Sequence, residues 1–211
     1  MKTFNIYILF MFFVFFGCNP SSNSKNTDLN DFKFLEIDIV TLNKGYVNQD
    51  YTIQEVIESY IDRINKIDQN GPRLNSIIEI NPEAISIAKS LDDELQTQGS
   101  RGYLHGVPIL LKDNIDTNDK MSTTAGSRAL KGSRPIKDSK VAEKLRKAGA
   151  VILGKANLSE WANFRGRRST SGWSGINGQT KNPYVLTRNP CGSSSGSGVS
   201  VSANLTLLAI G

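Results

Sequence analysis

Short apolar runs alternate with amphipathic segments along most of this chain. Residues 106–111 (GVPILL) and 150–153 (AVIL) are unbroken apolar runs of strand length, and such runs are typical of strands buried on both faces. Around them lie segments in which apolar residues recur every three or four positions, which is the spacing of one helix face. Helices that alternate with short buried strands predict an α/β domain built of layers.

The clearest helix is predicted to begin at Thr52, because Glu55 three positions later completes a capping box. Gly71 and Pro72 mark the end of this segment. Further elements are predicted at three places, namely a strand over 74–80, a helix from Asn81-Pro82 and a helix after Asp138. The predicted core faces comprise Ile53, Val56, Ile57, Tyr60, Ile61, Ile64 and Ile67 in the first helix and Val141, Leu145 and Ala148 in the third.

The charge pattern argues against a nucleic-acid partner. The formal charge of +5 comes from 25 Lys and Arg residues against 20 Asp and Glu residues. These basic residues are spread singly through amphipathic segments, whereas a nucleic-acid site would cluster them. The 2 cysteines in 211 residues are also too few for a disulfide framework.

The N-terminus has the pattern of an export signal. Lys2 precedes an apolar run over 4–16 that only Asn5 interrupts. This run is shorter than the roughly 20 apolar residues of a membrane span. Residues 1–17 are therefore predicted to be a signal peptide.

The junction of Gly17 and Cys18 resembles the lipobox of bacterial lipoproteins. The resemblance implies cleavage before Cys18 and a lipid on its thiol, although a plain signal peptide or a retained short anchor would also fit. The residues that follow are polar and rich in Asn and Ser, so 18–47 are predicted to be a lipidated tether and linker.

Hydroxyl groups are concentrated in residues 189–198 (NPCGSSSGSG), within a Gly-, Ser- and Asn-rich stretch over 164–198. Stretches of this length without regular structure usually carry function. A phosphate-binding loop is excluded, because the required Gly-Lys-Ser/Thr and Gly-x-Gly-x-x-Gly patterns are missing from it.

Two candidate nucleophiles, a serine in a nucleophile elbow and the thiol of Cys191, fit the sequence poorly. The run GSSSG at 192–196 has the form of a nucleophile elbow, but an α/β-hydrolase needs its histidine after the serine, and the single histidine, His105, precedes it. His105 is therefore interpreted as structural. With one histidine in the chain, Cys191 is interpreted as a small buried residue rather than a nucleophile.

A hydrolase without histidine needs another base, and Lys112 is the candidate. It follows the apolar run 107–111 and precedes Asp113, so that it would end a buried strand. To act near neutral pH its pKa must fall by about 3 units from about 10.4, which is the direction in which desolvation moves a lysine. A lysine at a strand end more often forms a salt bridge, so its spacing alone leaves both roles open.

Three motifs occur in the order and spacing of the amidase signature family: 106–115 (GVPILLKDNI), 148–157 (AGAVILGKAN) and 189–197 (NPCGSSSGS). In addition, 171–184 (SGWSGINGQTKNPY) resembles the peptide-amidase-like branch more than the tRNA amidotransferase subunit. The resemblance covers about 48–211 and implies a mixed β-sheet core flanked by helices on both faces.

The resemblance also implies a Ser–cis-Ser–Lys mechanism that uses no metal or cofactor. In this scheme Lys112 is the base, and Ser193, which follows a cis peptide bond, relays a proton to it. Gly192, Ser194 and Ser195 would support the loop. Trp161 and Ala162 match a family segment that lines the acyl pocket and are expected to bind substrate.

In this family the nucleophilic serine lies about 24 residues after the relay serine, in a turn whose N–H groups form the oxyanion hole. Here that position falls beyond Gly211. The resemblance therefore implies that 48–211 are the N-terminal part of an amidase domain and that the chain as given is inactive. The sheet would be truncated before it is complete, with the apolar run 205–211 as a strand that should be central to it.

The expected function is hydrolysis of C–N amide bonds in small amides or amidated peptides. The expected location is the periplasmic side of a bacterial cell envelope, with the lipid as the membrane anchor. One alternative is the glutaminase subunit of a tRNA amidotransferase, against which the export signal argues because that machine is cytoplasmic. The other is a non-catalytic lipoprotein that binds ligands in the amidase pocket, against which the exposed edge of a truncated sheet argues.

Overall fold

In the computed structural model, which describes residues 31–164 and 166–211, a mixed sheet has the strand order β1-β3-β2-β6. β2 (Pro108–Lys112) runs parallel to β3 (Val151–Ala156) and to β6 (Leu208–Ile210), whereas β1 (Ile77–Ile80) pairs antiparallel with β3. Every residue of β2 and β3 is buried, as their apolar runs predict. Within the described residues β6 lies at one edge of the sheet.

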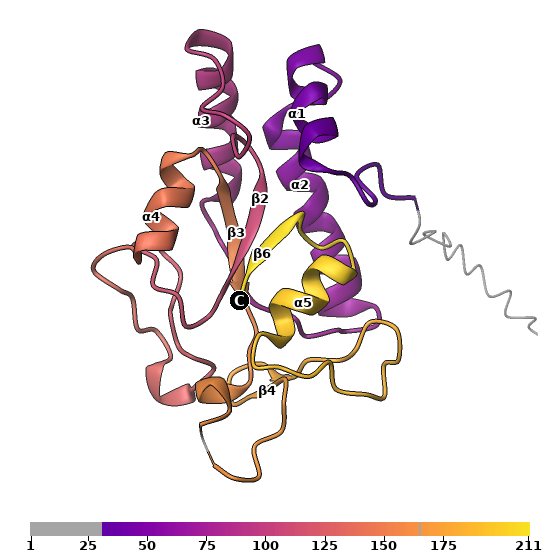
Figure 1. Ribbon diagram of the computed structural model, residues 1–211, viewed down its shortest axis with the longest axis vertical. Helices are drawn as coiled ribbons and strands as arrows, with labels where there is room; N and C mark the ends of the chain where they lie inside the picture. Colours follow the sequence, from indigo (N-terminus) through magenta and orange to yellow (C-terminus); the bar gives the residue numbers. More distant parts are fainter. Residues whose placement is uncertain (1–30, 165) are drawn as a thin grey trace, which may run out of the picture. The chain divides into compact units, whose positions relative to one another are not determined.

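Helices lie on both sides of this sheet (Figure 1). α4 (Lys140–Lys147) contacts β3 from the opposite side to α2 (Ile53–Arg63) and α5 (Ser195–Ser202). α2 packs against α3 (Ala84–Thr97) and continues into a π-helix, η1 (Ile64–Asn70). The predicted α/β architecture is therefore confirmed. Shorter elements are η2 (Arg128–Leu130), η3 (Glu160–Asn163), β4 (Trp173–Ser174) and β5 (Gly178–Gln179).

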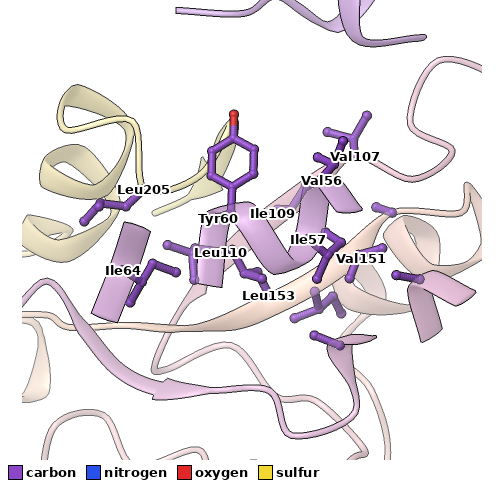
Figure 2. Close-up of a cluster of buried hydrophobic side chains, with 14 of the residues drawn as sticks. Val56, Ile57, Tyr60, Ile64, Val107, Ile109, Leu110, Val151, Leu153 and Leu205 are labelled. Atoms are coloured by element: carbon purple, nitrogen blue, oxygen red, sulfur yellow. The ribbon is translucent and has the colours of Figure 1, made fainter. Parts of the chain in front are cut away.

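The apolar stripe of α2 forms much of the core between the helices and the sheet (Figure 2). The predicted capping box is present, because Thr52 Oγ1 accepts from the Glu55 N–H and the Glu55 carboxylate accepts from the Thr52 N–H. Each large apolar side chain buried here contributes about 2 kcal/mol to stability. The packed side chains include Val56, Ile57, Tyr60 and Ile64 from the helical segment and Ile109, Leu110, Val151 and Leu153 from the strands.

The folded unit begins earlier than predicted. It extends over 32–211, so residues 32–47, which were expected to be linker, belong to it. Phe34 is buried, and α1 (Ile39–Asn48) adds Leu42 and Tyr46 to the core. The boundary expected at residue 48 is therefore wrong, because aromatic residues ahead of it supply core contacts. The predicted signal peptide and Cys18 lie outside the described residues.

Two helices differ in detail from the prediction. α3 begins at Ala84 rather than at Asn81-Pro82, and the Asn81 side chain accepts from the Glu83 N–H in the turn that precedes the helix. α4 begins one residue later than expected, with Ser139 as its cap. Leu145 is buried as predicted, together with Ala142, whereas Val141 in the helix and Ala148 at its C-cap are partly buried.

None of the helices in 31–164 and 166–211 combines the length and the apolar character needed to cross a membrane.

Candidate active site

Lys112 is the last residue of β2, and its side chain reaches the loop that precedes α5. Lys112 Nζ donates hydrogen bonds of 2.9 Å to both Ser193 Oγ and Ser194 Oγ. The residue is 7% exposed, and burial lowers the pKa of its ammonium group from the ordinary value of 10.5. Both partners are neutral hydroxyls, which stabilise the charged form less than a carboxylate would. The site therefore favours a lysine that can give up its proton and take one back.

The turn before Ser193 is shaped by close backbone packing. The peptide bond between Gly192 and Ser193 is cis, as the resemblance implies. A Cβ on Gly192 would lie 2.5 Å from Ser159 Oγ and 2.6 Å from Ser195 Oγ, so only glycine fits. Ser195 Oγ donates to the carbonyl oxygen of Cys191 at 2.6 Å and ties the turn to the start of α5. The predicted loop residues are thus brought together around Lys112.

Residues just after β3 hold this loop from the other side, and sequence reasoning missed them. The Ser159 N–H donates to the Ser193 carbonyl at 2.9 Å, and the Asn157 carbonyl accepts from the Gly196 N–H at 2.8 Å. The signal was available, because carboxyl ends of neighbouring parallel strands meet at one edge of a sheet. The segment after Ala156 therefore had to lie beside the segment after Lys112, its partner in the register.

Asp113 follows the base in sequence but bonds to a different segment. Its Oδ2 accepts from the N–H groups of Thr124 and Gly126, each at 3.3 Å, and from the Thr124 hydroxyl. Burial raises the pKa of Asp113 to about 6, while these hydrogen bonds and the ammonium of Lys155 act in the opposite direction. The carboxylate thereby fixes the turn at 124–126.

Trp161 and Ala162 lie on the wall of a cavity of about 430 Å³, which Asn114 and Ala125 also line. Trp161 is 44% exposed. Trp161, Ala162 and Ala125 have φ values of 52°, 53° and 49°, a left-handed conformation that residues with a side chain rarely adopt. Such conformations cluster at binding and active sites. The structure therefore places the two predicted pocket residues at a cavity beside the strand that ends in Lys112, and their role in binding stays a prediction.

A second cavity, of about 390 Å³, opens at the loop itself. Its lining includes Ser193, Ser194, Tyr184 and Pro190. The serine hydroxyls that Lys112 contacts are therefore next to space that a substrate could occupy.

His105 is buried, whereas Cys191 is exposed in the turn before Ser193. His105 is 1% exposed, with Nδ1 accepting from the Arg101 N–H at 3.3 Å and Nε2 donating to the Leu91 carbonyl at 3.0 Å, which confirms its structural interpretation. Cys191 is exposed, so the expected burial is wrong. Its left-handed φ of 64° leaves the side chain at the surface of the turn.

Among the described residues, no group of three or more His, Cys, Asp and Glu side chains is arranged to hold a metal ion.

A buried lysine bonded to serine hydroxyls at the end of a mixed sheet is an arrangement suited to hydrolysis through a serine nucleophile. The family described as amidase matches residues 55–211, and the chain belongs to this amidase family.

Curated relatives agree with this assignment. The chain is 46% identical over 182 residues to a probable amidase of Arabidopsis thaliana, covering 85% of this chain and 35% of that protein. It is 36% identical over 180 residues to the glutamyl-tRNA(Gln) amidotransferase A subunit of Alkaliphilus metalliredigens, covering 85% of this chain and 35% of that protein. The chain thus spans about a third of the length of these relatives.

Solved structures show the same fold. The peptide amidase of Stenotrophomonas maltophilia superimposes with a TM-score of 0.82 at 49% identity, covering 84% of this chain and 36% of that one. An amidase family protein of Bacillus anthracis superimposes with a TM-score of 0.81 at 36% identity, covering 89% of this chain and 38% of that one. The amidase-signature fold expected from the sequence is therefore confirmed.

Proposed function

We propose that the full-length product of this gene is an amidase that hydrolyses C–N amide bonds with a Ser–Ser–Lys site. The observation that carries the proposal is the buried 2.9 Å contact between Lys112 Nζ and Ser193 Oγ. Membership of the amidase family supports it. A neutral lysine can serve as the base, so the scheme needs no metal or cofactor.

In the proposed mechanism Lys112 starts neutral and accepts a hydrogen bond from the Ser193 hydroxyl. A nucleophilic serine, which the resemblance places beyond Gly211, attacks the carbonyl carbon of the amide. Its proton passes to Ser193 Oγ as the proton of Ser193 passes to Lys112 Nζ. The proton then returns by the same route to the leaving nitrogen, the C–N bond breaks, and water hydrolyses the acyl-enzyme through the same relay.

The proposed substrates are small amides and C-terminally amidated peptides. Similarity to a peptide amidase at 49% identity supports this class. The cavity of about 430 Å³ beside Trp161 is large enough for an amino-acid side chain, and its indole ring offers an apolar surface.

Release of ammonia from an amidated dipeptide tests the proposal. We expect turnover by the full-length wild type and a loss of about 100-fold or more in kcat for Ser193→Ala, because the proton relay is removed. Ser90→Ala, at an exposed position of α3, is the matched control and should keep wild-type turnover. A wild type that binds the amide without hydrolysing it would overturn the proposal and favour a non-catalytic binding module.

A second candidate is a glutaminase that works in a tRNA amidotransferase. It is supported by two glutamyl-tRNA(Gln) amidotransferase A subunits, which are 36% and 40% identical to the chain. The same assay with free glutamine in place of the dipeptide distinguishes the two candidates. Faster hydrolysis of glutamine than of the peptide amide would favour the glutaminase.

We also propose that the protein is exported and held at the periplasmic side of the bacterial envelope by a lipid on Cys18. This proposal rests on the sequence of residues 1–18.

A further inference from the structure

Behind the loop that carries Ser193, a buried carboxylate is held entirely by neutral donors. Asp68 lies in η1 and is fully buried. Its oxygens accept from the Ser76 N–H at 2.7 Å, the Ser76 hydroxyl at 2.5 Å, the Ile77 N–H at 3.2 Å and Gln69 Nε2 at 2.7 Å. π-Helical segments such as η1 occur frequently at functional sites. Through these hydrogen bonds the carboxylate fixes the position of Ser76 and Ile77, where β1 begins.

Ser76 connects this carboxylate to α5. Ser200 Oγ, on α5, lies 3.0 Å from Ser76 Oγ, and both residues are fully buried. An ionised carboxylate can only accept hydrogen bonds, so the Ser76 hydroxyl must donate to Asp68. Its oxygen is then free only to accept, and Ser200 must donate to it. The charge of Asp68 thereby sets the direction of both hydrogen bonds.

Ser76 also contacts the first turn of α5. A Cβ on Gly196 would lie 2.2 Å from the Ser76 carbonyl oxygen, so helix and strand are in direct contact there. The same carbonyl accepts from the Asn157 N–H at 2.8 Å. α5 is therefore held at two points by one residue, and its first residue, Ser195, directly follows the two serines that bond to Lys112.

We propose that Asp68 is a positioning residue for the amidase site, acting through Ser76 on α5 to keep the loop serines at hydrogen-bond distance from Lys112. This inference rests on the proposed function for its kinetic consequences. A shift of about 1 Å in such a site lowers the rate by up to about 100-fold, so small movements of α5 would be visible in kcat.

Ser200→Ala is the sharpest variant, because it cuts the connection to α5 and leaves the carboxylate with all four donors. In the full-length protein we expect kcat to fall about tenfold, with KM changed less than about twofold, since alignment and not substrate contact is lost. Val201→Ala, at an exposed position of the same helix that does not line the loop cavity, is the control and should match the wild type.

Asp68→Asn tests the carboxylate itself. We expect a loss in kcat at least as large as that of Ser200→Ala. The double variant should be no slower than Asp68→Asn alone, because both substitutions break one chain of contacts. Wild-type kcat in both single variants, with only a lower midpoint of unfolding, would overturn the proposal and leave Asp68 a purely structural residue.

Hydrogen–deuterium exchange provides a readout that does not depend on turnover. In Ser200→Ala, the amides of 193–202 should exchange faster while those of β2 stay unchanged. Unchanged exchange at 193–202 would overturn the positioning role even if the protein is an active amidase. Faster exchange in a protein without amidase turnover would retain the positioning role and reject the proposed function instead.

Discussion

Two buried lysines of the central strands differ in what their ammonium groups contact. Lys155 Nζ donates to the Ile115 carbonyl at 2.6 Å and to Thr123 Oγ1 at 2.7 Å, and the negative charge of Asp113 acts on it. Lys112 contacts two serine hydroxyls. Both lysines contact hydroxyls, but the charge of Asp113 favours the ammonium form of Lys155, whereas burial lowers the pKa of Lys112. On this ground we propose Lys112 as the base and a structural role for Lys155.

The free energy of unfolding should depend on pH because of Asp113. Because burial raises the pKa of Asp113 from 3.8 to about 6, the folded state keeps this proton at a pH at which the unfolded chain has lost it. The contribution of Asp113 to the free energy of unfolding should therefore fall as pH rises from about 4 to about 6, by about 3 kcal/mol in total.

Urea unfolding of the wild type and of Asp113→Asn between pH 4 and pH 7 measures this effect as a difference. We expect the variant to gain stability relative to the wild type as pH rises. Asp93→Asn, at an exposed position of α3, is the control and should track the wild type. A wild-type-minus-variant difference that does not change with pH would show that Asp113 ionises normally in the fold.

At the residue scale, the motif predicted Ser193 and the loop residues Gly192 and Ser195, but not Ser159 and Asn157, which hold the loop from the other side. Ser159 and Asn157 bond to the loop through main-chain groups, so strand register, and not side-chain chemistry, was the signal that could have indicated them. The exposure of Cys191 depends on a left-handed turn, and a sequence pattern does not report that conformation for a cysteine.

Among the elements, α5 is the one most dependent on its surroundings. Its sequence, SGSGVSVS, contains two glycines and four serines, which are poor helix formers. Contacts with β2, β3 and β6 compensate for this weak propensity. The two glycines have different environments, which makes them a matched pair of test sites.

Gly196→Ala and Gly198→Ala should act in opposite directions. A Cβ at Gly196 would meet backbone atoms of Ser76 and Asn157 at 2.2 and 2.5 Å, whereas none lies within 4 Å of a Cβ at Gly198. We expect Gly196→Ala to cost about 2 kcal/mol or more of stability and Gly198→Ala to add up to about 1 kcal/mol through helix propensity. Urea unfolding checks both, and equal effects would contradict the packing described for α5.

The elements that could be predicted were those with a local signal. α2 has a capping box and a long apolar stripe, and both were found. α5 lacks such a pattern, because serines and glycines make up most of it. Its helical form depends on tertiary contacts that a local pattern does not contain.

At the scale of the whole molecule, we make separate proposals for the two ends of the chain. The folded unit over 32–211 carries the candidate site, and residues 1–18 carry the proposed export and lipidation signal. The two proposals can be tested separately.

Lipidation at Cys18 should be visible by labelling in a bacterial host. With an alkyne fatty acid in the medium, we expect the wild type to be labelled and to sediment with membranes, and Cys18→Ser to lose both properties. The chain has 2 cysteines, so Cys191→Ser is the matched control and should remain labelled. Labelling that survives Cys18→Ser would place the lipid elsewhere.

The central claim is that Lys112 is the base of an amide hydrolase, and the most direct test is kcat/KM for an amidated dipeptide measured against pH with the full-length protein. We expect the rate of the wild type to rise with pH as Lys112 loses its proton, and Lys112→Ala to lose about 1,000-fold or more with the fold retained. Lys89→Ala, at an exposed position of α3, should behave as the wild type. A folded Lys112→Ala variant within tenfold of the wild-type rate would contradict the claim.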